Sequence, residues 1–257
     1  MPTLAQVAEF LDTTLNISGV PDYPTAVNGV QLANIGAIDH VATAVDFSSE
    51  TVNGAIDAGA QLLLVHHGMF WGGVQPLTGH RHLRLRALIT RDVAVYAAHL
   101  PLDVHPSLGN NALLARLLEL EPRAGFAKYQ SIDVGLSGTA DVATRVLADK
   151  ARLLAEQYGG QLVVTPFAPE RMTRAWGICS GAGADSATLR EAAAKGLDTL
   201  IVGEGPHHTA VEARELGIVV LYAGHYATET LGVRAVGDLL AERFGVTTTF
   251  VDAPTGL

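Results

Sequence analysis

The stretch Leu62-Leu63-Leu64-Val65-His66-His67-Gly68 determines which fold we expect for this chain. Four consecutive apolar residues are typical of a short strand that is buried on both faces, and Gly68 marks the point where the chain leaves that strand. His66 and His67 therefore fall at its carboxyl end. In open α/β sheets ligands bind at that edge, because the loops there converge on a crevice. Imidazole is the commonest metal ligand, so the pair is a candidate metal site; the alternative is a pair of hydrogen-bonded core histidines.

The flanking sequence alternates between apolar runs and amphipathic segments, as an α/β fold requires. Apolar runs predict strands at 41–45 and 93–98, and Ser48-Ser49-Glu50 predicts the start of a helix between the first of these and the histidine strand. A helix is also predicted over 79–91. Its basic face is interpreted as a solvent or subunit-contact face in preference to a phosphate site.

Two further segments complete the first half of the chain. Apolar residues at helical spacing over 1–17 predict an amphipathic helix that docks on the body of the protein. Asn28-Gly29 predicts a tight turn with positive φ, an interpretation that we favour over a direct chemical role for Asn28.

Composition excludes several classes of function. The chain has 257 residues, of which 48% are hydrophobic and 17% charged, and its net charge is −9. Such a chain forms a compact core but has little affinity for nucleic acid or anionic membranes, since those are bound mainly through Lys and Arg. The single cysteine, Cys179, cannot form an internal disulfide. With no signal peptide or membrane span in the sequence, we expect a cytoplasmic protein.

The second half of the chain repeats the plan of the first. The segment Gly196 to Gly205 aligns with Gly59 to Gly68, which places Glu204 at the position of His67. Helices are predicted on either side of it, at 185–195 and 210–216. We therefore predict an α/β fold of two similar lobes related by an internal repeat, residues 1–123 and residues 124–257, in a single intertwined unit.

The repeat extends to the chemistry at the strand ends. His99 and Asp103 follow the strand at 93–98, and His225 and Glu229 follow a strand at 218–223 in the same His-x-x-x-acid spacing. Two such lobes packed together would bring these strand ends to a shared cleft.

The segment between the two copies has its own pattern. Residues 141–158 predict a helix that Gly159-Gly160 ends, because glycine readily adopts the conformation found after a helix carboxyl terminus. The apolar side chains expected on the buried side of this helix are Val142, Val146, Leu147, Leu153 and Leu154.

The side chains gathered at these strand ends suit a pair of divalent metal ions. His66, His67 and His225 supply imidazoles, and Asp103 and Glu229 supply carboxylates that can bridge two cations. This mixture of nitrogen and oxygen ligands suits zinc, manganese, iron or cobalt better than calcium or magnesium. Two such metals with a bridging hydroxide form a hydrolytic centre.

Four sequence motifs resemble those of a known family, in the same order along the chain. They are Asn28-Gly29-Val30-Gln31-Leu32, the His66-His67 pair, Ala98 to Asp103 with Leu108-Gly109-Asn110-Asn111, and Gly224 to Glu229. The family is that of the dinuclear-metal proteins similar to the NGG-one-interacting factor, often named GTP cyclohydrolase I type 2 homologues. The resemblance spans nearly the whole chain, which is similar to the short form of the family without an inserted domain.

The resemblance implies a two-lobed α/β fold with two divalent metals between the lobes, and a homohexamer built as a trimer of dimers. By motif, the metal ligands are His66, His67, Asp103, His225 and Glu229. His99 matches a position beside the metals, where it would be catalytic or would orient a ligand; we give these two roles equal weight.

Two classes of function remain open. The first is a metal-dependent hydrolase of an unidentified small molecule such as a nucleotide, and the second is a metal-binding scaffold or regulatory partner without turnover. A structural site needs only closed ligation, so additional titratable groups favour the enzyme. These additional groups are His99, Glu204, His207 and His208. Gly181-Ala182-Gly183 is interpreted as a plain turn from strand to helix in preference to a phosphate site.

Overall fold

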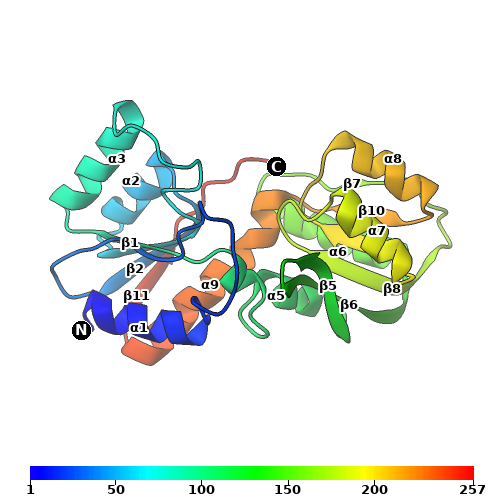
Figure 1. Cartoon of the computed structure of the whole chain (residues 1–257), viewed down its shortest axis with the longest axis horizontal. Coiled ribbons are helices and arrows are strands. Elements are labelled where there is room, and N and C mark those ends of the chain that lie inside the picture. Colours follow the sequence, from blue (N-terminus) through cyan, green and yellow to red (C-terminus); the bar gives the residue numbers. More distant parts are fainter. The chain divides into compact units, whose positions relative to one another are not determined.

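The computed structural model describes all residues from 1 to 257 and contains two β-sheets with flanking helices, a mixed α/β fold (Figure 1). It separates into two compact units. The first comprises Met1–Leu102 with Gly232–Ala253, and the second comprises Asp103–Leu231 with Pro254–Leu257. The boundary expected after residue 123 lies inside the second of these units. None of the helices combines the length and the apolar composition that a membrane crossing requires.

The first unit is built on a five-stranded sheet in the order β1-β4-β3-β2-β11. Strands β2, β3, β4 and β11 are parallel, and β1 pairs antiparallel with β4. The elements of this unit are α1 (Leu4–Thr14), β1 (Gly29–Leu32), β2 (His40–Asp46), α2 (Ser49–Asp57), β3 (Leu62–His67), α3 (Gly79–Thr90), β4 (Ala94–Ala97), the later part of α9 (His225–Phe244) and β11 (Thr247–Phe250).

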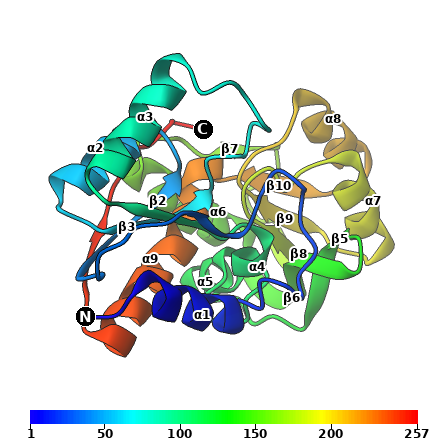
Figure 2. The same cartoon turned by 60° about the vertical axis from the view of Figure 1, so that its left-hand side comes forward.

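Helices cover both faces of this sheet, which is why β3 is buried along its whole length, as its apolar sequence predicts. In Figures 1 and 2, α2 and α3 lie on one face, and α1 lies on the other together with the later part of α9. Ser48 caps α2 through a capping box with Thr51, so the predicted helix start is confirmed. Helix α1 buries Val7 and Leu11.

The second unit is built on a six-stranded sheet in the order β5-β6-β8-β9-β10-β7. Its central strands β8, β9 and β10 are parallel, and the outer strands are antiparallel to their neighbours. The elements are α4 (Leu100–Asp103, which crosses the division), α5 (Asn110–Leu117), β5 (Ala124–Tyr129), β6 (Ile132–Ala143), α6 (Thr144–Gln157), β7 (Val163–Val164), β8 (Met172–Cys179), α7 (Ser186–Ala194), β9 (Thr199–Val202), α8 (His207–Glu215), β10 (Val219–Tyr222) and the start of α9.

Helix α6 corrects the prediction for residues 141–158. It begins only at Thr144, because the residues before it continue strand β6, where Val142 pairs with Thr173. Val146 and Leu153 are 38% and 68% exposed, so their placement in the core was wrong. Leu147 and Leu154 are buried as predicted, and the rest of the buried stripe consists of Ala148, Ala151 and Ala155 at helical spacing. Gly159 follows the helix with positive φ, as predicted.

Each unit contains three successive parallel strands joined by helices, and polar side chains follow the carboxyl ends of these strands. In the first unit these side chains are Asp46, His67 and His99, at the ends of β2, β3 and β4. In the second unit they are Ser180, Glu204 and His225, which follow β8, β9 and β10. The carboxyl edge of each parallel sheet is therefore where each unit collects its chemically active groups.

Candidate metal centre

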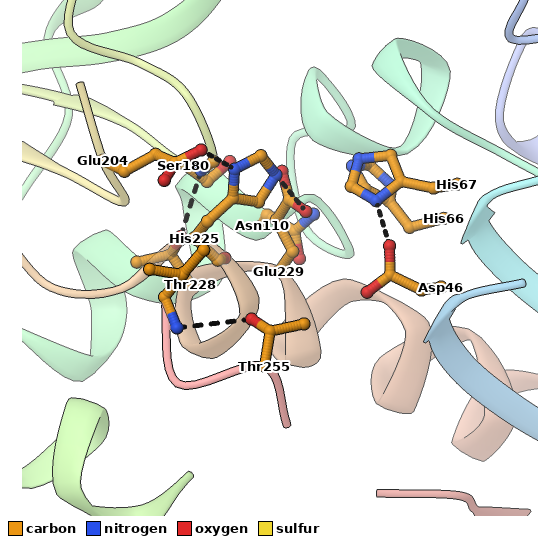
Figure 3. Close-up of polar contacts among 12 residues, drawn as sticks. Asp46, His66, His67, Asn110, Ser180, Glu204, His225, Thr228, Glu229 and Thr255 are labelled. Carbon is orange, nitrogen blue, oxygen red and sulfur yellow. Dashed lines mark hydrogen bonds and ion pairs between the residues drawn. The ribbon is translucent and has the colours of Figure 1, made fainter. Parts of the chain in front are cut away.

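His66 and His67 are buried at the end of β3, and each ring is held through Nδ1. Nδ1 of His66 lies 2.9 Å from the carbonyl oxygen of Ala98, and Nδ1 of His67 lies 2.9 Å from Oδ1 of Asp46 (Figure 3). A carbonyl or carboxylate oxygen only accepts hydrogen bonds, so Nδ1 of each ring carries the proton. With Nδ1 as the donor, Nε2 is the nitrogen of each ring that can bind a metal, which is the arrangement that metal-ligating histidines use.

His99 is held in the same way by a buried carboxylate from a distant loop. Its Nδ1 donates to Oδ1 of Asp22 at 2.8 Å, and Asp22 also accepts from Asn28 Nδ2 at 2.7 Å and from the Leu100 N–H at 2.9 Å. Burial alone would raise the pKa of Asp22, but the hydrogen bonds and the positive charge of His99 lower it on balance. Asp22 is therefore a carboxylate that keeps the His99 ring in one orientation and tautomer.

Asn28 has a direct part in this arrangement. Its Oδ1 accepts from the backbone N–H of His99 at 2.8 Å, while its amide donates to Asp22. Gly29 has the positive φ that the Asn-Gly pair predicts, +100°, but it begins strand β1, so the predicted tight turn does not form at this pair. Interpreting Asn28 only as a turn residue was therefore incomplete, because its side chain holds the backbone on which His99 stands.

The structure brings three of these imidazoles together within the first unit. The ligand nitrogens of His66, His67 and His99 lie within 4.8 Å of one another, and all three residues are buried. Buried imidazoles whose ligand nitrogens lie this close together could hold a metal ion.

Asp103 is buried in the second unit, where side chains from α5 and β8 orient it. Its Oδ1 accepts from Asn110 Nδ2 at 2.8 Å and from Ser180 Oγ at 3.3 Å. The neighbouring Asn111 donates to the Val134 carbonyl at 2.9 Å and accepts from the Ser180 N–H at 2.8 Å. Asn110 thus binds the Asp103 carboxylate directly, and Asn111 holds the backbone of Ser180, whose hydroxyl also binds that carboxylate.

His225 and Glu229 lie together at the start of α9. The four-residue spacing places Nε2 of His225 3.2 Å from Oε2 of Glu229, as predicted from one turn of helix. Nδ1 of His225 lies 2.8 Å from Oε1 of Glu204 (Figure 3). Burial lowers the pKa of His225, but the hydrogen bonds and charges of Glu229 and Glu204 outweigh this effect and raise it to about 9.

Gly181 makes room for Glu229. A Cβ atom at this position would overlap Oε1 of Glu229, and Gly181 has a φ of +60°, which disfavours any other residue. The Gly181 N–H donates to Oγ1 of Thr228 at 3.0 Å. This glycine-rich segment therefore acts as a turn that shapes the carboxylate site.

Among the remaining candidates, Glu204 supports His225, whereas His207 and His208 are exposed at the start of α8. Cys179 is buried, and burial together with the charge of Asp103 raises the pKa of its thiol. A neutral thiol is a poor metal ligand.

Sequence reasoning missed three supporting residues, Asp22, Asp46 and Ser180. Asp46 and Ser180 each follow a predicted strand, and their position at the sheet edge was the available signal.

The donor set of the two units fits divalent cations. It combines buried imidazoles, each with the second ring nitrogen anchored, and buried carboxylates that accept hydrogen bonds from neighbouring side chains. Such anchoring sets ring orientation and ligand basicity in protein metal sites.

A family model described as Duf34/NIF3 (NGG1p interacting factor 3) matches residues 2–255. A GTP cyclohydrolase 1 type 2 homolog of Deinococcus radiodurans is 38% identical over 254 residues, covering 98% of this chain and 94% of the relative. A protein of the same name from Halobacterium salinarum is 43% identical over 242 residues, covering 93% of this chain and 94% of the relative.

Solved structures agree with this match. The structural-genomics protein ybgI, described as of unknown function, superposes with a TM-score of 0.87 at 31% identity and covers 99% of this chain and 100% of its own. TTHA1606 from Thermus thermophilus superposes with a TM-score of 0.79 at 32% identity, covering 98% of this chain and 99% of its own. HcgD from Methanocaldococcus jannaschii, at 23% identity and a TM-score of 0.82, supports the fold alone.

Proposed function

Because this chain belongs to the Duf34/NIF3 family, we propose that it is a hydrolase that uses two divalent metal ions per chain. The proposed metal ligands are His66, His67, Asp103, His225 and Glu229, and the proposed metals are zinc, manganese, iron or cobalt. In this proposal the two units resemble each other through an internal repeat, and both contribute ligands to one dinuclear centre.

One observation carries the proposal: four buried or largely buried imidazoles have Nδ1 bonded to an oxygen acceptor. The acceptors are the Ala98 carbonyl for His66, and the carboxylates of Asp46, Asp22 and Glu204 for His67, His99 and His225 respectively. A core histidine needs partners only for its own polar atoms. The same bonding at four rings, each at the carboxyl end of a parallel strand, is the pattern that supports metal ligands.

Two divalent cations bound by this donor set would supply a hydroxide nucleophile at neutral pH and would polarise the bond under attack. The protein then has to move a proton to the leaving atom. His99 is suited to that task because its Nε2 is available to exchange a proton while its Nδ1 stays bonded to Asp22. The Asp22 carboxylate stabilises the imidazolium that forms when Nε2 takes up the proton, and it holds the ring in position throughout.

The substrate that we propose is a small molecule with a bond that water can cleave. The name of the curated relatives makes guanosine triphosphate one compound to test. We also propose a homohexamer, built as a trimer of dimers, because the family resemblance implies this assembly and soluble oligomers usually have closed symmetry.

Metal content is the first test of this proposal. In the double variant His66→Ala with Asp103→Ala, elemental analysis should show near-complete loss of the two metals while the circular dichroism spectrum is retained. The matched control is His82→Ala, which removes an exposed imidazole on α3 and should leave the metals in place. Unchanged metal content in the double variant would refute the ligand assignment.

Activity is the second test. The metal-loaded protein should hydrolyse at least one member of a panel of nucleotides, phosphoesters and cyclic amides, with Glu229→Gln as the inactive blank. His99→Asn should lower turnover by about 100-fold with both metals retained, which is the usual size of a general acid–base contribution. If the metal-loaded protein hydrolyses no compound of the panel, the result would favour the non-enzymatic scaffold instead.

A further inference from the structure

Two large aromatic side chains stand beside the histidine cluster of the first unit and remain accessible to solvent. Tyr23 is 47% exposed and Trp71 is 38% exposed. The ring centroid of Trp71 lies 4.4 Å from that of His99 and 4.8 Å from that of His67. The ring of Tyr23 lies 5.9 Å from that of His99. Both aromatic rings therefore border the imidazoles directly.

The loops that carry these rings are fastened to one another by Gln31 on β1. Its Nε2 donates to the carbonyls of Ala26 and Val27 at 3.0 and 2.9 Å, and its Oε1 accepts from the Met69 N–H at 2.7 Å. A Cβ atom at Gly68 would overlap the Gln31 amide, so a larger residue where the second loop leaves β3 would displace this amide from its position.

The Tyr23 loop is also fastened to the group that holds His99. The Tyr23 N–H donates to Oδ1 of Asp22 at 2.7 Å, and the same oxygen accepts from Nδ1 of His99. The segment between β3 and α3, which carries Trp71, follows His67 directly in the sequence. The carboxylate that holds His99 therefore also holds the Tyr23 backbone, and Gln31 holds the start of the segment that carries Trp71.

The two rings form a corner. Their centroids are 6.1 Å apart and their planes meet at 85°. No ring can be sandwiched between perpendicular planes, but a planar ring stacked on one wall presents its edge to the other. Offset stacking and edge-to-face contact are the two arrangements that aromatic rings prefer, and the corner offers both at once.

We propose that Tyr23 and Trp71 form a recognition subsite for a planar aromatic or heteroaromatic ring of the substrate, next to the hydrolytic centre. This inference rests on the proposed function, because it assigns the substrate class of the same site. A saturated ring of equal size is puckered and has no π face, so it can make neither contact. The subsite thus selects for ring planarity, while the bond to be cleaved faces the imidazoles.

The test uses two lactams that differ only in saturation, quinolin-2-one and decahydroquinolin-2-one, with the zinc-loaded full-length protein. Calorimetry should show at least about 10-fold tighter binding of the planar lactam, in line with the size of ring stacking on aromatic side chains. The planar lactam should also quench tryptophan fluorescence. That signal reports on Trp71, since the only other tryptophan, Trp176, is fully buried.

Substitutions of Tyr23 and Trp71 test whether the preference for the planar lactam depends on these two rings. Trp71→Leu and Tyr23→Leu should each remove most of the 10-fold preference, whereas Trp71→Phe and Tyr23→Phe should keep it. A shift of the Trp71 indole N–H resonance in the wild-type protein, caused by the ring current of the planar lactam, provides evidence that depends on no substitution. Equal binding of the two lactams, absence of that shift, or a preference that survives in both Leu variants would overturn the inference.

Metal content measured on the same samples separates the two proposals. Full metal occupancy and turnover without planar preference would overturn the subsite and leave the hydrolase standing. Planar preference that depends on Trp71 and Tyr23, in a protein that retains no metal after loading, would support the subsite and overturn the hydrolase.

Discussion

Replacing Gly181 by alanine should displace Glu229 from its position beside His225. A Cβ atom on residue 181 would overlap Oε1 of Glu229 and would lie 3.3 Å from Nε2 of His225. Glu229 is buried on α9, so its carboxylate can leave only by rotating away from this pair. If Glu229 and His225 bind metal, the variant loses two adjacent ligand positions through a single added methyl group.

The expected loss of stability has two parts. An alanine at a φ of +60° costs about 1–2 kcal/mol because of backbone strain. Displacing the buried carboxylate from its charged hydrogen bond with His225 costs about 1.5–3 kcal/mol more. Gly196 provides the matched control, because it has a φ of +67° and nothing lies within 4 Å of its Cβ position. Gly196→Ala should therefore show the first cost alone.

Urea unfolding of both metal-free variants measures the two free energies, and elemental analysis after metal loading measures occupancy. We expect Gly181→Ala to be less stable than Gly196→Ala by about 1.5–3 kcal/mol, the hydrogen-bond cost alone, and to lose most of its metal. Gly196→Ala should bind metal as the wild type does. Equal metal occupancy in the two variants would refute the role assigned to Gly181 and Glu229.

Three further results are expected. Asp22 has a lowered pKa, so its ionised form adds stability that is complete above its unfolded value of 3.8 and is lost as the pH falls through the folded value. Asp22→Asn should therefore reduce the fall in the free energy of unfolding at low pH, as measured by urea unfolding. An unchanged pH dependence would count against the buried carboxylate. The pKa of His225 is raised to about 9 in the metal-free protein, so its contribution to stability is complete below pH 6.5 and is lost as the pH rises through about 9. Glu204→Gln should lower the titration midpoint of the His225 ring in NMR spectra. An unchanged midpoint would contradict the pairing of His225 with Glu204. Asp46→Ala should weaken metal binding by about 10–100-fold in competition with a chelator, because it removes the hydrogen bond that orients the His67 ring. The control Asp57→Ala, on the exposed side of α2, should have no effect. Equal metal affinities of the two variants would contradict the support that Asp46 gives to His67.

Strands with continuous apolar sequence could be predicted, and the hairpin β5–β6 could not. Strand β6 carries Gly135 and Gly138, which weaken any strand prediction from sequence. In the fold these glycines are required by close packing: a Cβ at Gly135 would overlap the Ile178 carbonyl, and one at Gly138 would press on the Glu121 carbonyl and the Trp176 ring. The constraint comes from a neighbouring strand far along the chain, and local sequence does not contain it.

Some residues of the candidate site could likewise be predicted from the sequence, and others could not. His66 and His67 could be located because they end an apolar strand, and His225 with Glu229 because of their spacing on a helix. The partner of His99 could not be located, since Asp22 lies 77 residues away in a loop without periodic pattern. A residue that orients a site histidine contacts it only in the folded protein, so the spacing of residues in the sequence does not reveal it.

Strand β11 also has a consequence for the order of synthesis. It pairs parallel with β2, yet about 200 residues of the chain lie between the two strands. At about 5–20 residues per second, the ribosome needs roughly 10–40 s to deliver β11 after β2 has emerged. During that time the outer edge of β2 has no strand to pair with, and unpaired apolar edges invite association with other nascent chains. The sheet of the first unit is therefore completed only after nearly all of the second unit has been made, so a translation product that stops before β11 would expose the unpaired edge of β2.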